Sequence, residues 1–249
     1  MAKEALPLAA HLSDLRKCIV HSLWILFAGF GVCVYFSEKI FNFIRGPIVP
    51  YLGDFHGLVF TAPIDKFVAH LKVSFLAGAI ITCPLWLYQI WLFIAPGLYK
   101  KEKKMAVSFL FFGSLLFLTG VIFVYKLVYP MAFKYLLTFG GSVDKPMITI
   151  SEYLSFFITT TLIFGLAFEM PLIVLALAMM GVLDEEFLRT KRRMAIMVLA
   201  IFSAVVTPPD AISMLSLLMP LVLLYEISIV LVRMLAKGSR FPYADQKPL

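Results

Sequence analysis

Charge is scarce in this sequence: only 15% of its 249 residues are Asp, Glu, Lys or Arg, whereas 61% are hydrophobic. A soluble domain carries about a quarter charged residues and could not cover this much apolar surface. The sequence also lacks the alternation of apolar and polar residues, in segments of about ten, that marks a membrane β-barrel. Its apolar runs instead continue for roughly twenty residues, the length of a helix that crosses a bilayer. The sequence therefore predicts an all-α integral membrane protein.

Motifs for catalysis, metals and nucleotides are missing as well. The three cysteines, Cys18, Cys33 and Cys83, lie in apolar runs without metal-ligand spacing, which is typical of small packing residues. The chain has no Walker-type glycine loop and no His-Glu-x-x-His pair. We therefore expect neither enzyme activity nor a cofactor nor a metal. The net charge of +7 does not indicate nucleic acid here, because basic residues of membrane proteins collect in cytoplasmic loops.

Six apolar segments indicate six transmembrane helices in a single membrane domain, residues 1–249. The spans are predicted at 18–36, 69–94, 105–125, 153–180, 194–206 and 211–232, followed by a cytoplasmic tail at 233–249. The last two spans are short, and 194–206 makes only about 20 Å of helix against a hydrocarbon core of about 30 Å. Residues 37–68 are broken by proline and glycine and are predicted to lie on the membrane surface. Residues 126–152 are predicted to form a second external excursion.

The distribution of basic residues predicts the orientation. Fifteen of the 22 lysines and arginines lie in the N-terminus, in the loops at 95–104 and 181–193, and in the tail. Since cytoplasmic segments carry the excess of positive charge, both termini are predicted to face the cytoplasm.

The stretch from Pro84 to Lys104 places a lone acid at that cytoplasmic face. An apolar segment containing Gln89 breaks at Pro96-Gly97 and leads into a loop in which Glu102 is surrounded by four lysines. Taken alone, Glu102 is an incidental acid in a charged loop, and Asp14 belongs to an ordinary polar helix start.

Glu169 lies deep in the fourth span, where a carboxylate costs about 2.5–3.5 kcal/mol. Such a side chain is either protonated or bonded to a polar partner. One hypothesis is that it bonds within the chain, through Gln89 or a carbonyl freed near Pro171. The other is that it serves as a docking point for another helix or as a proton site. Glu226 has no basic residue one helical turn onward, so we expect it to extend toward the membrane interface.

In its order of motifs, nearly the whole chain resembles the TatC family, the multispanning core of the twin-arginine protein translocase. The matching segments are His11–Lys17, Pro47, Pro63–Phe67, Tyr88–Glu102, Phe168–Pro171, Lys191–Arg193, Thr207–Asp210 and Pro220–Ser228. Each of these motifs is weak alone, but their order and their topology together are specific.

The resemblance implies a subunit of the bacterial cytoplasmic (inner) membrane that binds twin-arginine signal peptides of folded proteins. Acids at the positions of Asp14 and Glu102 would hold the arginine pair, because a carboxylate meets a guanidinium in two hydrogen bonds that lysine does not imitate. The signal-peptide site implied for this chain comprises Asp14, Arg16, Phe93, Leu98, Tyr99 and Glu102. The family's usual acid at position 14 is glutamate, which is one methylene longer.

The resemblance also implies a glove-shaped bundle that assembles with the single-span proteins TatA and TatB, self-associates and uses the proton-motive force for export. Glu169 and Gln89 would be intramembrane polar residues for a partner helix, and Pro47 and Asp210 would be structural residues of the external side. The family often has glutamine where this chain has Met214, so a partner hydrogen bond there is not implied.

Two functions from other classes stay open. A proton-coupled secondary transporter would use Glu169 as its titrating site and would show paired broken helices in matching halves. Prolines interrupt the spans at Pro171 and Pro220, but no internal repeat surrounds them. A membrane anchor of a respiratory enzyme would need histidines that share a haem, and His21 and His70 are predicted at opposite ends of the spans.

Overall fold

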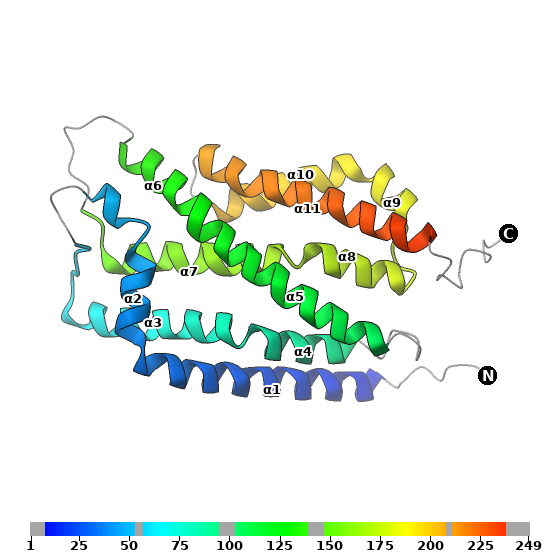
Figure 1. Cartoon of the computed structure of the whole chain (residues 1–249), viewed down its shortest axis with the longest axis horizontal. Helices are drawn as coiled ribbons and strands as arrows, with labels where there is room; N and C mark the ends of the chain where they lie inside the picture. The colour runs from blue at the N-terminus through cyan, green and yellow to red at the C-terminus, as the bar shows by residue number, and fades with distance from the viewer. Residues whose placement is uncertain (1–7, 53–56, 95–102, 139–146, 208–210, 238–249) are drawn as a thin grey trace. The chain divides into compact units, whose positions relative to one another are not determined.

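The structure is a computed structural model that describes residues 8–52, 57–94, 103–138, 147–207 and 211–237. Within these ranges the chain is helical, and a single isolated bridge between Val59 and Thr149 takes the place of any strand. The helices (Figure 1) are α1 (Leu8–Tyr35), α2 (Ser37–Arg45), η1 (Val49–Tyr51), α3 (Pro63–Ile81), α4 (Cys83–Ile94), α5 (Lys103–Phe123), the π-helical turn η4 (Val124–Val128), α6 (Tyr129–Thr138), α7 (Ile150–Ala167), α8 (Met170–Met179), α9 (Glu185–Thr190), α10 (Arg192–Val206) and α11 (Ala211–Lys237). The predicted all-α membrane class is confirmed.

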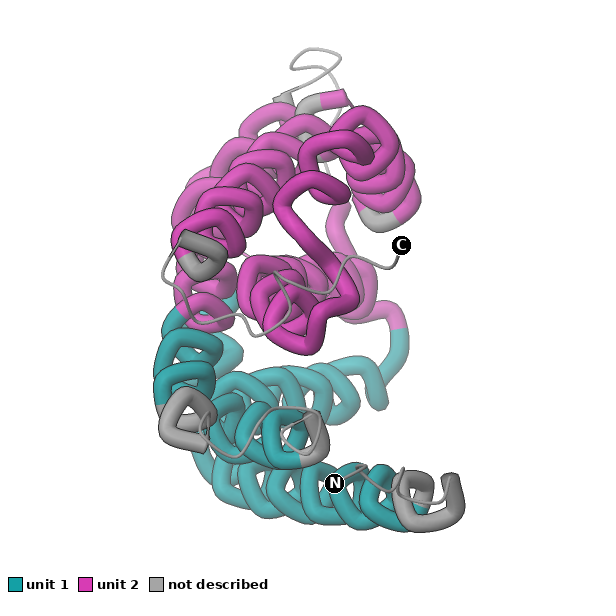
Figure 2. The backbone as a smooth tube through the Cα atoms, turned by 90° about the vertical axis from the view of Figure 1, so that its right-hand side faces the viewer, with its two compact units in different colours: residues 1–44, 62–115 teal, residues 45–61, 116–249 magenta. Residues whose placement is uncertain are grey.

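The helices pack into two compact units, coloured separately in Figure 2. Unit 1 comprises residues 1–44 and 62–115, and unit 2 comprises residues 45–61 and 116–249. In unit 1, α1 lies along both α3 and α4. In unit 2, α11 packs against α8 and α10. The single domain predicted from the sequence stays a prediction.

Four described helical segments are long and apolar enough to cross a membrane: Ser13–Tyr35, Ser108–Leu137, Ile150–Met179 and Met214–Met234. A fifth span would consist of Pro63–Ile81 and Cys83–Leu92, which are bent by 58° at the break between them. The sequence did not predict this bend within 69–94. The remaining predicted span corresponds to α10, whose 15 residues make about 22 Å of helix. The count of six spans stays a prediction.

The external excursion predicted at 126–152 begins later than expected, because the helix continues through η4 and α6 to Thr138. The packing of Tyr129 explains the continuation. Its side chain is fully buried, and its hydroxyl donates to Phe157 O at 2.7 Å and lies 2.7 Å from Thr161 Oγ1. Pro130 lacks an N–H, and the π-helical turn η4 directly before it already departs from the regular pattern, since the Tyr129 N–H bonds Val124 O, five residues back. Tertiary packing on α7 therefore extends this span beyond the point where its sequence becomes polar.

The segment at 37–68 is only partly an amphipathic surface helix. Its first residues form α2, but its last residues already belong to α3, which begins at Pro63, six residues before the predicted span. Asp65 accounts for this early start, because its Oδ2 accepts the Ala62 N–H at 2.8 Å and satisfies one donor at the helix end. The predicted position on the membrane surface stays a prediction.

Two glycines allow α5 and α7 to cross closely within unit 2. A Cβ added at Gly120 would lie 2.8 Å from the carbonyl oxygen of Phe164, and one added at Gly165 would lie 2.6 Å from Cε2 of Phe117. Small residues at such crossings let helix backbones approach in a membrane, where packing supplies much of the association energy. This crossing supports α7 at the end that leads to Glu169.

Candidate functional site

Asp14 and Arg16 lie on the first turns of α1 and are exposed. The Asp14 carboxylate, 57% exposed, is 3.8 Å from the Lys17 ammonium, one turn along the helix. An exposed pair at this spacing is worth only about 0.3–0.5 kcal/mol, so a better cation would displace it at little cost. The structure thus leaves the Asp14 carboxylate accessible, as a binding role requires.

A bend separates α3 from α4 at Thr82. Pro84 has no N–H, so the carbonyl of residue 80 loses its helical donor and the helix is interrupted. The Thr82 hydroxyl donates to Gly78 O at 2.7 Å, and the indole N–H of Trp86 donates to Ala79 O at 2.9 Å. Polar side chains thus bond carbonyls at the break, as a span without water around it requires. The sequence analysis missed the roles of Thr82 and Trp86, although Pro84 inside an apolar run already indicates a helix break.

The first helix packs against α3 and α4 in one constant antiparallel register. The Ser74 hydroxyl lies 3.4 Å from Cys33 O, and the Cys18 thiol donates to Gln89 O at 3.1 Å. Between these contacts, a Cβ on Gly78 would lie 2.7 Å from the backbone nitrogen of Phe30, beside Gly29. Each step along α1 from one contact to the next is matched by an equal step in the opposite direction along α3 and α4. The register is therefore unbroken across the bend.

This register places Asp14 at the level of Phe93. Asp14 lies four residues before Cys18, and Phe93 lies four residues after Gln89, so the first turns of α1 and the last turn of α4 share one end of unit 1. The Trp91 and Phe109 rings, with centroids 4.6 Å apart, tie the same end of α4 to the start of α5. Three helix ends thus meet where the sequence predicts the signal-peptide site.

Three of the predicted site residues, Leu98, Tyr99 and Glu102, lie outside the described residues. The segment that carries them is bounded by the end of α4 at Ile94 and the start of α5 at Lys103, both in unit 1. Glu102 directly precedes α5 in the sequence. The role of these residues stays a prediction.

Glu169 occupies the break between α7 and α8 in unit 2. Its side chain is 5% exposed, and its Oε1 has no hydrogen-bond partner in the part of the chain that the structure describes. Pro171, the second residue of α8, interrupts the helix because it lacks an N–H. The Glu169 backbone bridges the interruption: its N–H donates to Leu166 O at 3.1 Å, and its carbonyl accepts from Leu172 N at 3.0 Å. The interruption predicted beside this acid is confirmed, and its depth in the membrane stays a prediction.

The other predicted residues are placed as follows. Gln89 is half-buried in unit 1, and its carbonyl accepts the Cys18 thiol. Because Glu169 belongs to unit 2, a bond between the Gln89 and Glu169 side chains stays a prediction. Pro47 is buried just after α2, which fits a structural role. Asp210 lies outside the described residues.

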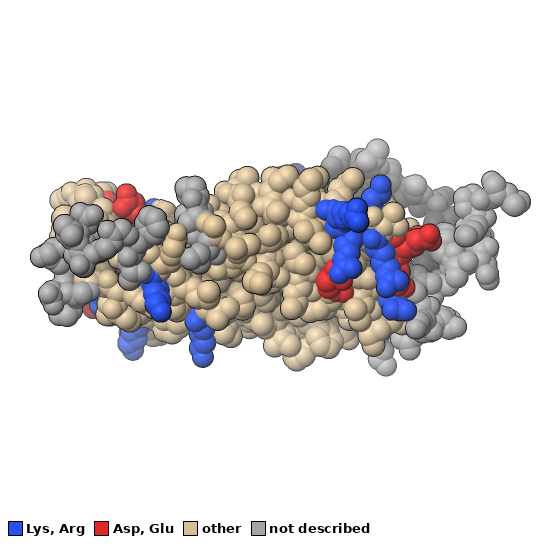
Figure 3. Space-filling view, turned by 90° about the horizontal axis from the view of Figure 1, so that it is seen from above, with Lys and Arg blue, Asp and Glu red and all other residues tan. Residues whose placement is uncertain are grey.

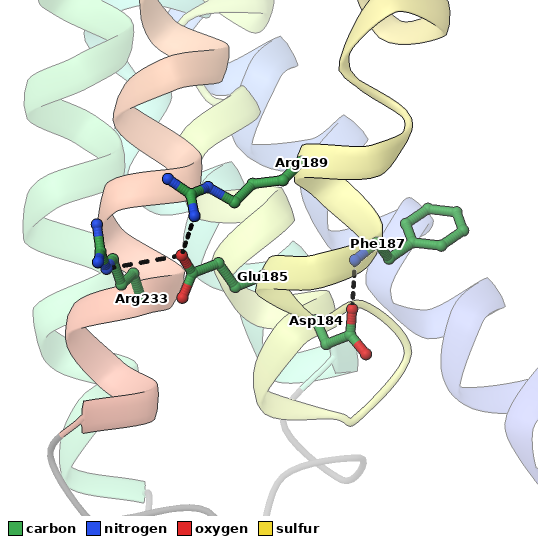
Figure 4. A network of polar contacts seen from close by, with 5 residues as sticks. All are labelled: Asp184, Glu185, Phe187, Arg189 and Arg233. Atoms are coloured by element: carbon green, nitrogen blue, oxygen red, sulfur yellow. Dashed lines mark hydrogen bonds and ion pairs between the residues drawn. The ribbon is translucent and has the colours of Figure 1, made fainter.

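Ion pairs at the ends of α9, α10 and α11 were not foreseen. Glu226 Oε1 lies 2.5 Å from the guanidinium of Arg192, so the acid has a partner from another helix and does not merely extend toward the interface. Glu185 pairs with Arg189 at 3.5 Å and with Arg233 at 3.6 Å (Figure 4). Figure 3 shows Lys and Arg side chains gathered against Asp and Glu side chains, beside a surface without charge. The Glu226–Arg192 and Glu185–Arg233 pairs join residues far apart in sequence, so a search for pairs at helical spacing misses them.

A backbone contact completes the packing of α9 on α11. The Tyr225 hydroxyl donates to Leu188 O at 2.7 Å, and both residues belong to a buried cluster with Ala178, Ile229 and Val232. Asp184 accepts the Phe187 N–H at 2.6 Å and so caps the first turn of α9 (Figure 4). Asp184 and Glu185 at the acidic start of α9 therefore serve local structure.

Comparisons with known proteins agree in sequence and in fold. A family model described as Sec-independent protein translocase protein (TatC) matches residues 10–220. Proteins named Sec-independent protein translocase protein TatC are similar to this chain. The one from Koribacter versatilis is 40% identical over 232 residues, which cover 92% of this chain and 85% of that protein. The one from Campylobacter jejuni is 38% identical over 242 residues, which cover 96% of this chain and 98% of that protein.

A solved structure described as a crystal structure of twin arginine translocase receptor TatC has the same fold. It superposes with a TM-score of 0.80 at 33% identity, and the match covers 91% of this chain and 99% of that one. A second crystal structure of that receptor, in the detergent DDM, also gives a TM-score of 0.80, at 34% identity.

Proposed function

This chain belongs to the TatC family of Sec-independent protein translocase proteins, and from its membership we propose the following function. Its family role is protein transport through a membrane rather than catalysis. The chain binds twin-arginine signal peptides of folded precursors at the cytoplasmic face of the bacterial inner membrane, with both of its termini on that side. The single observation that carries this proposal is the constant register of α1 on α3 and α4, which brings the accessible Asp14 level with the last turn of α4.

Two carboxylates, those of Asp14 and Glu102, receive the two adjacent guanidinium groups. Each guanidinium presents a planar fork of N–H donors that meets a carboxylate in two parallel hydrogen bonds, whereas an ammonium presents a compact point charge. The accessibility of Asp14 supports this role, and its weak pair with Lys17 is easily exchanged for a bidentate one. The site therefore selects arginine over lysine by geometry.

The surroundings of Glu102 refine this selection. Lys100, Lys101, Lys103 and Lys104 flank the acid in sequence and repel peptides that carry scattered positive charge. Arg16 adds to that positive surface beside Asp14. Phe93, Leu98 and Tyr99 contact the apolar segment that follows the arginine pair in a signal peptide. An arginine pair thus binds the two acids, and the apolar segment that follows it binds the three apolar side chains.

Glu169 serves the next stage, the assembly with single-span partners of the TatA and TatB type. A buried carboxylate oxygen without a partner among the described residues is costly, and a polar side chain from a partner helix would satisfy it. Gln89 is the second polar residue available to a partner. Export then draws on the proton-motive force. Membership of a protein translocase family favours this receptor over the proton-coupled permease that Glu169 alone would allow.

The decisive experiment measures the binding of a fluorescent twin-arginine signal peptide to the purified protein in lipid nanodiscs. Glu102→Ala is expected to weaken binding about a hundredfold, because each hydrogen bond between a carboxylate and a charged guanidinium is worth about 1.5–3 kcal/mol. A peptide with lysines in place of both arginines is expected to bind the unchanged protein about as weakly.

The matched control is Glu186→Ala, which removes an exposed acid from the other basic loop. Its peptide affinity should stay within about twofold of the unchanged protein, because exposed charges contribute little. Equal losses in Glu102→Ala and Glu186→Ala, or equal affinities for the arginine and lysine peptides, would contradict the proposal.

A further inference from the structure

We propose that Trp86 is a positioning residue, whose indole brackets the bend between α3 and α4 and so sets where the last turn of α4 lies against α1. We call the hydrogen bond from the Trp86 indole to Ala79 O the bracket, and both of its residues belong to unit 1. Its consequence for signal-peptide binding rests on the function proposed above.

The indole bond crosses the break. Trp86 Nε1 donates to Ala79 O at 2.9 Å, from the first turn of α4 to the last turn of α3. In an uninterrupted helix that carbonyl would be occupied by the N–H four residues on. The Thr82 hydroxyl, bonded to Gly78 O at 2.7 Å, completes the α3 side of the break. The indole bond joins residues seven positions apart on the two sides of the break, and it therefore constrains the angle between the helices.

The first helix abuts the bend itself. A Cβ on Gly29 would lie 2.5 Å from Cγ2 of Thr82 and 3.1 Å from Gly78 O. The contacts on the two sides of this point, Cys33 with Ser74 and Cys18 with Gln89, keep one register. Since α1 contacts α3 and α4 at once, this register depends on the present angle of 58° between them.

A small change in that angle becomes a large displacement at the candidate site. Twelve residues separate Thr82 from Ile94, which is about 18 Å of helix, so a rotation of about 10° at the break moves Ile94 by about 3 Å. Hydrogen bonds to a guanidinium tolerate much less than this, because they weaken steeply beyond about 3.2 Å. The bracket therefore decides where the last turn of α4 lies relative to Asp14.

Trp86→Phe tests the bracket, because it removes the indole N–H and keeps an aromatic ring. The matched control is Trp24→Phe, a tryptophan of α1 that is 72% exposed. Both variants are prepared in a cysteine-free protein carrying Cys18→Ser, Cys33→Ala and Cys83→Ala. The serine retains a donor for Gln89 O.

Spin-label distances are the first readout. One label pair, at Ser13 and Leu92, reports on the end of α4, and the other, at Val32 and Phe75, reports on α1 and α3 beyond the bend; all four positions are exposed. Trp86→Phe is expected to shift or broaden the first distance distribution and to leave the second unchanged. Trp24→Phe should change neither. An unchanged Ser13–Leu92 distribution in Trp86→Phe would overturn the bracket.

Peptide affinity is the second readout. Trp86→Phe is expected to weaken binding of the arginine-pair peptide about tenfold, roughly the factor that one lost hydrogen bond produces, and to leave the lysine-pair peptide unchanged. A shifted distance without a loss of affinity would overturn the positioning role. If the unchanged protein fails to distinguish the two peptides, the proposed function is wrong, and the label distances still decide on the bracket.

Discussion

Two spans of this protein are broken by a proline in the second position of the following helix, and the two breaks are satisfied differently. At the first, between α3 and α4, Thr82 and Trp86 donate to the carbonyls of Gly78 and Ala79. At the second, between α7 and α8, the buried Glu169 Oε1 has no partner among the described residues. The first break bends its span by 58°, whereas the second leaves a single segment, Ile150–Met179.

The two breaks therefore differ in their hydrogen bonding: the polar side chains at the first bond within the chain, whereas a carboxylate oxygen at the second is left without a partner among the described residues. The first break adds two side-chain donors that bond carbonyls at the end of α3. The second adds an acceptor that the described part of unit 2 leaves unpaired, in a buried position where an unpaired polar group is costly. Proline in a span thus predicts an interruption, while the neighbouring side chains decide whether it needs a partner.

The largest expected effect comes from overpacking the first break. In Gly78→Val, the new Cβ would lie 2.7 Å from the backbone nitrogen of Phe30, which has no room to yield. We expect a loss of about 3 kcal/mol in stability, the upper part of the usual range for overpacking. Thermal unfolding of the purified protein measures it. The control is Gly31→Ala, since a Cβ there meets nothing within 4 Å; if Gly31→Ala destabilises the protein equally, close packing at the bend is not the cause.

Glu169→Ala tests whether the second break is unsatisfied. We expect export of a twin-arginine precursor by membrane vesicles to fall about tenfold, the factor that corresponds to about 1.4 kcal/mol of lost association. Binding of the signal peptide should be unchanged. The thermal stability of the isolated protein should be equal or higher, because an unpaired buried polar group costs about 1–3 kcal/mol.

Glu169→Gln is the control for this test, because it keeps a hydrogen-bonding side chain of the same size. It should retain more export than Glu169→Ala. A loss of stability in the isolated Glu169→Ala protein would show that the carboxylate already has a partner within its own chain, and the contrast between the breaks would fail.

Replacing each proline compares the breaks directly. Pro84→Ala should change stability by less than about 1 kcal/mol and leave the bend in place, because the Thr82 and Trp86 bonds remain. Pro171→Ala restores an N–H for the carbonyl of residue 167 and should straighten the helix past Glu169. Spin labels at Phe75 and Leu92 report the first angle, and labels at Leu166 and Ile173 report the second. A first span that straightens in Pro84→Ala would show that proline alone makes the bend.

The smallest effect is expected from Thr82→Val, which removes one hydroxyl and keeps the side-chain shape. The lost bond to Gly78 O should cost about 0.5 kcal/mol, the low end for a hydrogen bond, because that carbonyl still accepts the Thr82 backbone N–H at 3.0 Å. Ser203→Ala serves as the comparison, because the buried Ser203 hydroxyl has no partner among the described residues. Its removal should leave stability equal or higher in a thermal unfolding assay, because an unpaired buried hydroxyl is costly, and equal losses in both variants would erase the distinction between a bonded and an unbonded hydroxyl.

The sequence was enough to predict the break at Glu169, whereas the signal-peptide site stays a prediction. Pro171 and Glu169 predict an interrupted span with a buried acid, since proline lacks an N–H and carboxylates are rare at this depth. Pro84 carries the same signal, yet the bend it marks was missed. The pair of Glu226 and Arg192 was also missed, because residues 34 positions apart share no local period. A polar residue in an apolar run predicts that a hydrogen-bond partner is needed, but the sequence does not show which distant residue provides it.

Composition and hydrophobic runs alone determined the membrane class, the helical fold and the approximate limits of the spans, because a bilayer forces every backbone group into helices of a set length. The tertiary structure decided the register of α1 on α3 and α4, the indole bond across the bend and the extension of α5 through α6. These depend on glycines that let backbones approach and on donors that meet carbonyls far along the chain, and such pairings arise only when the helices pack.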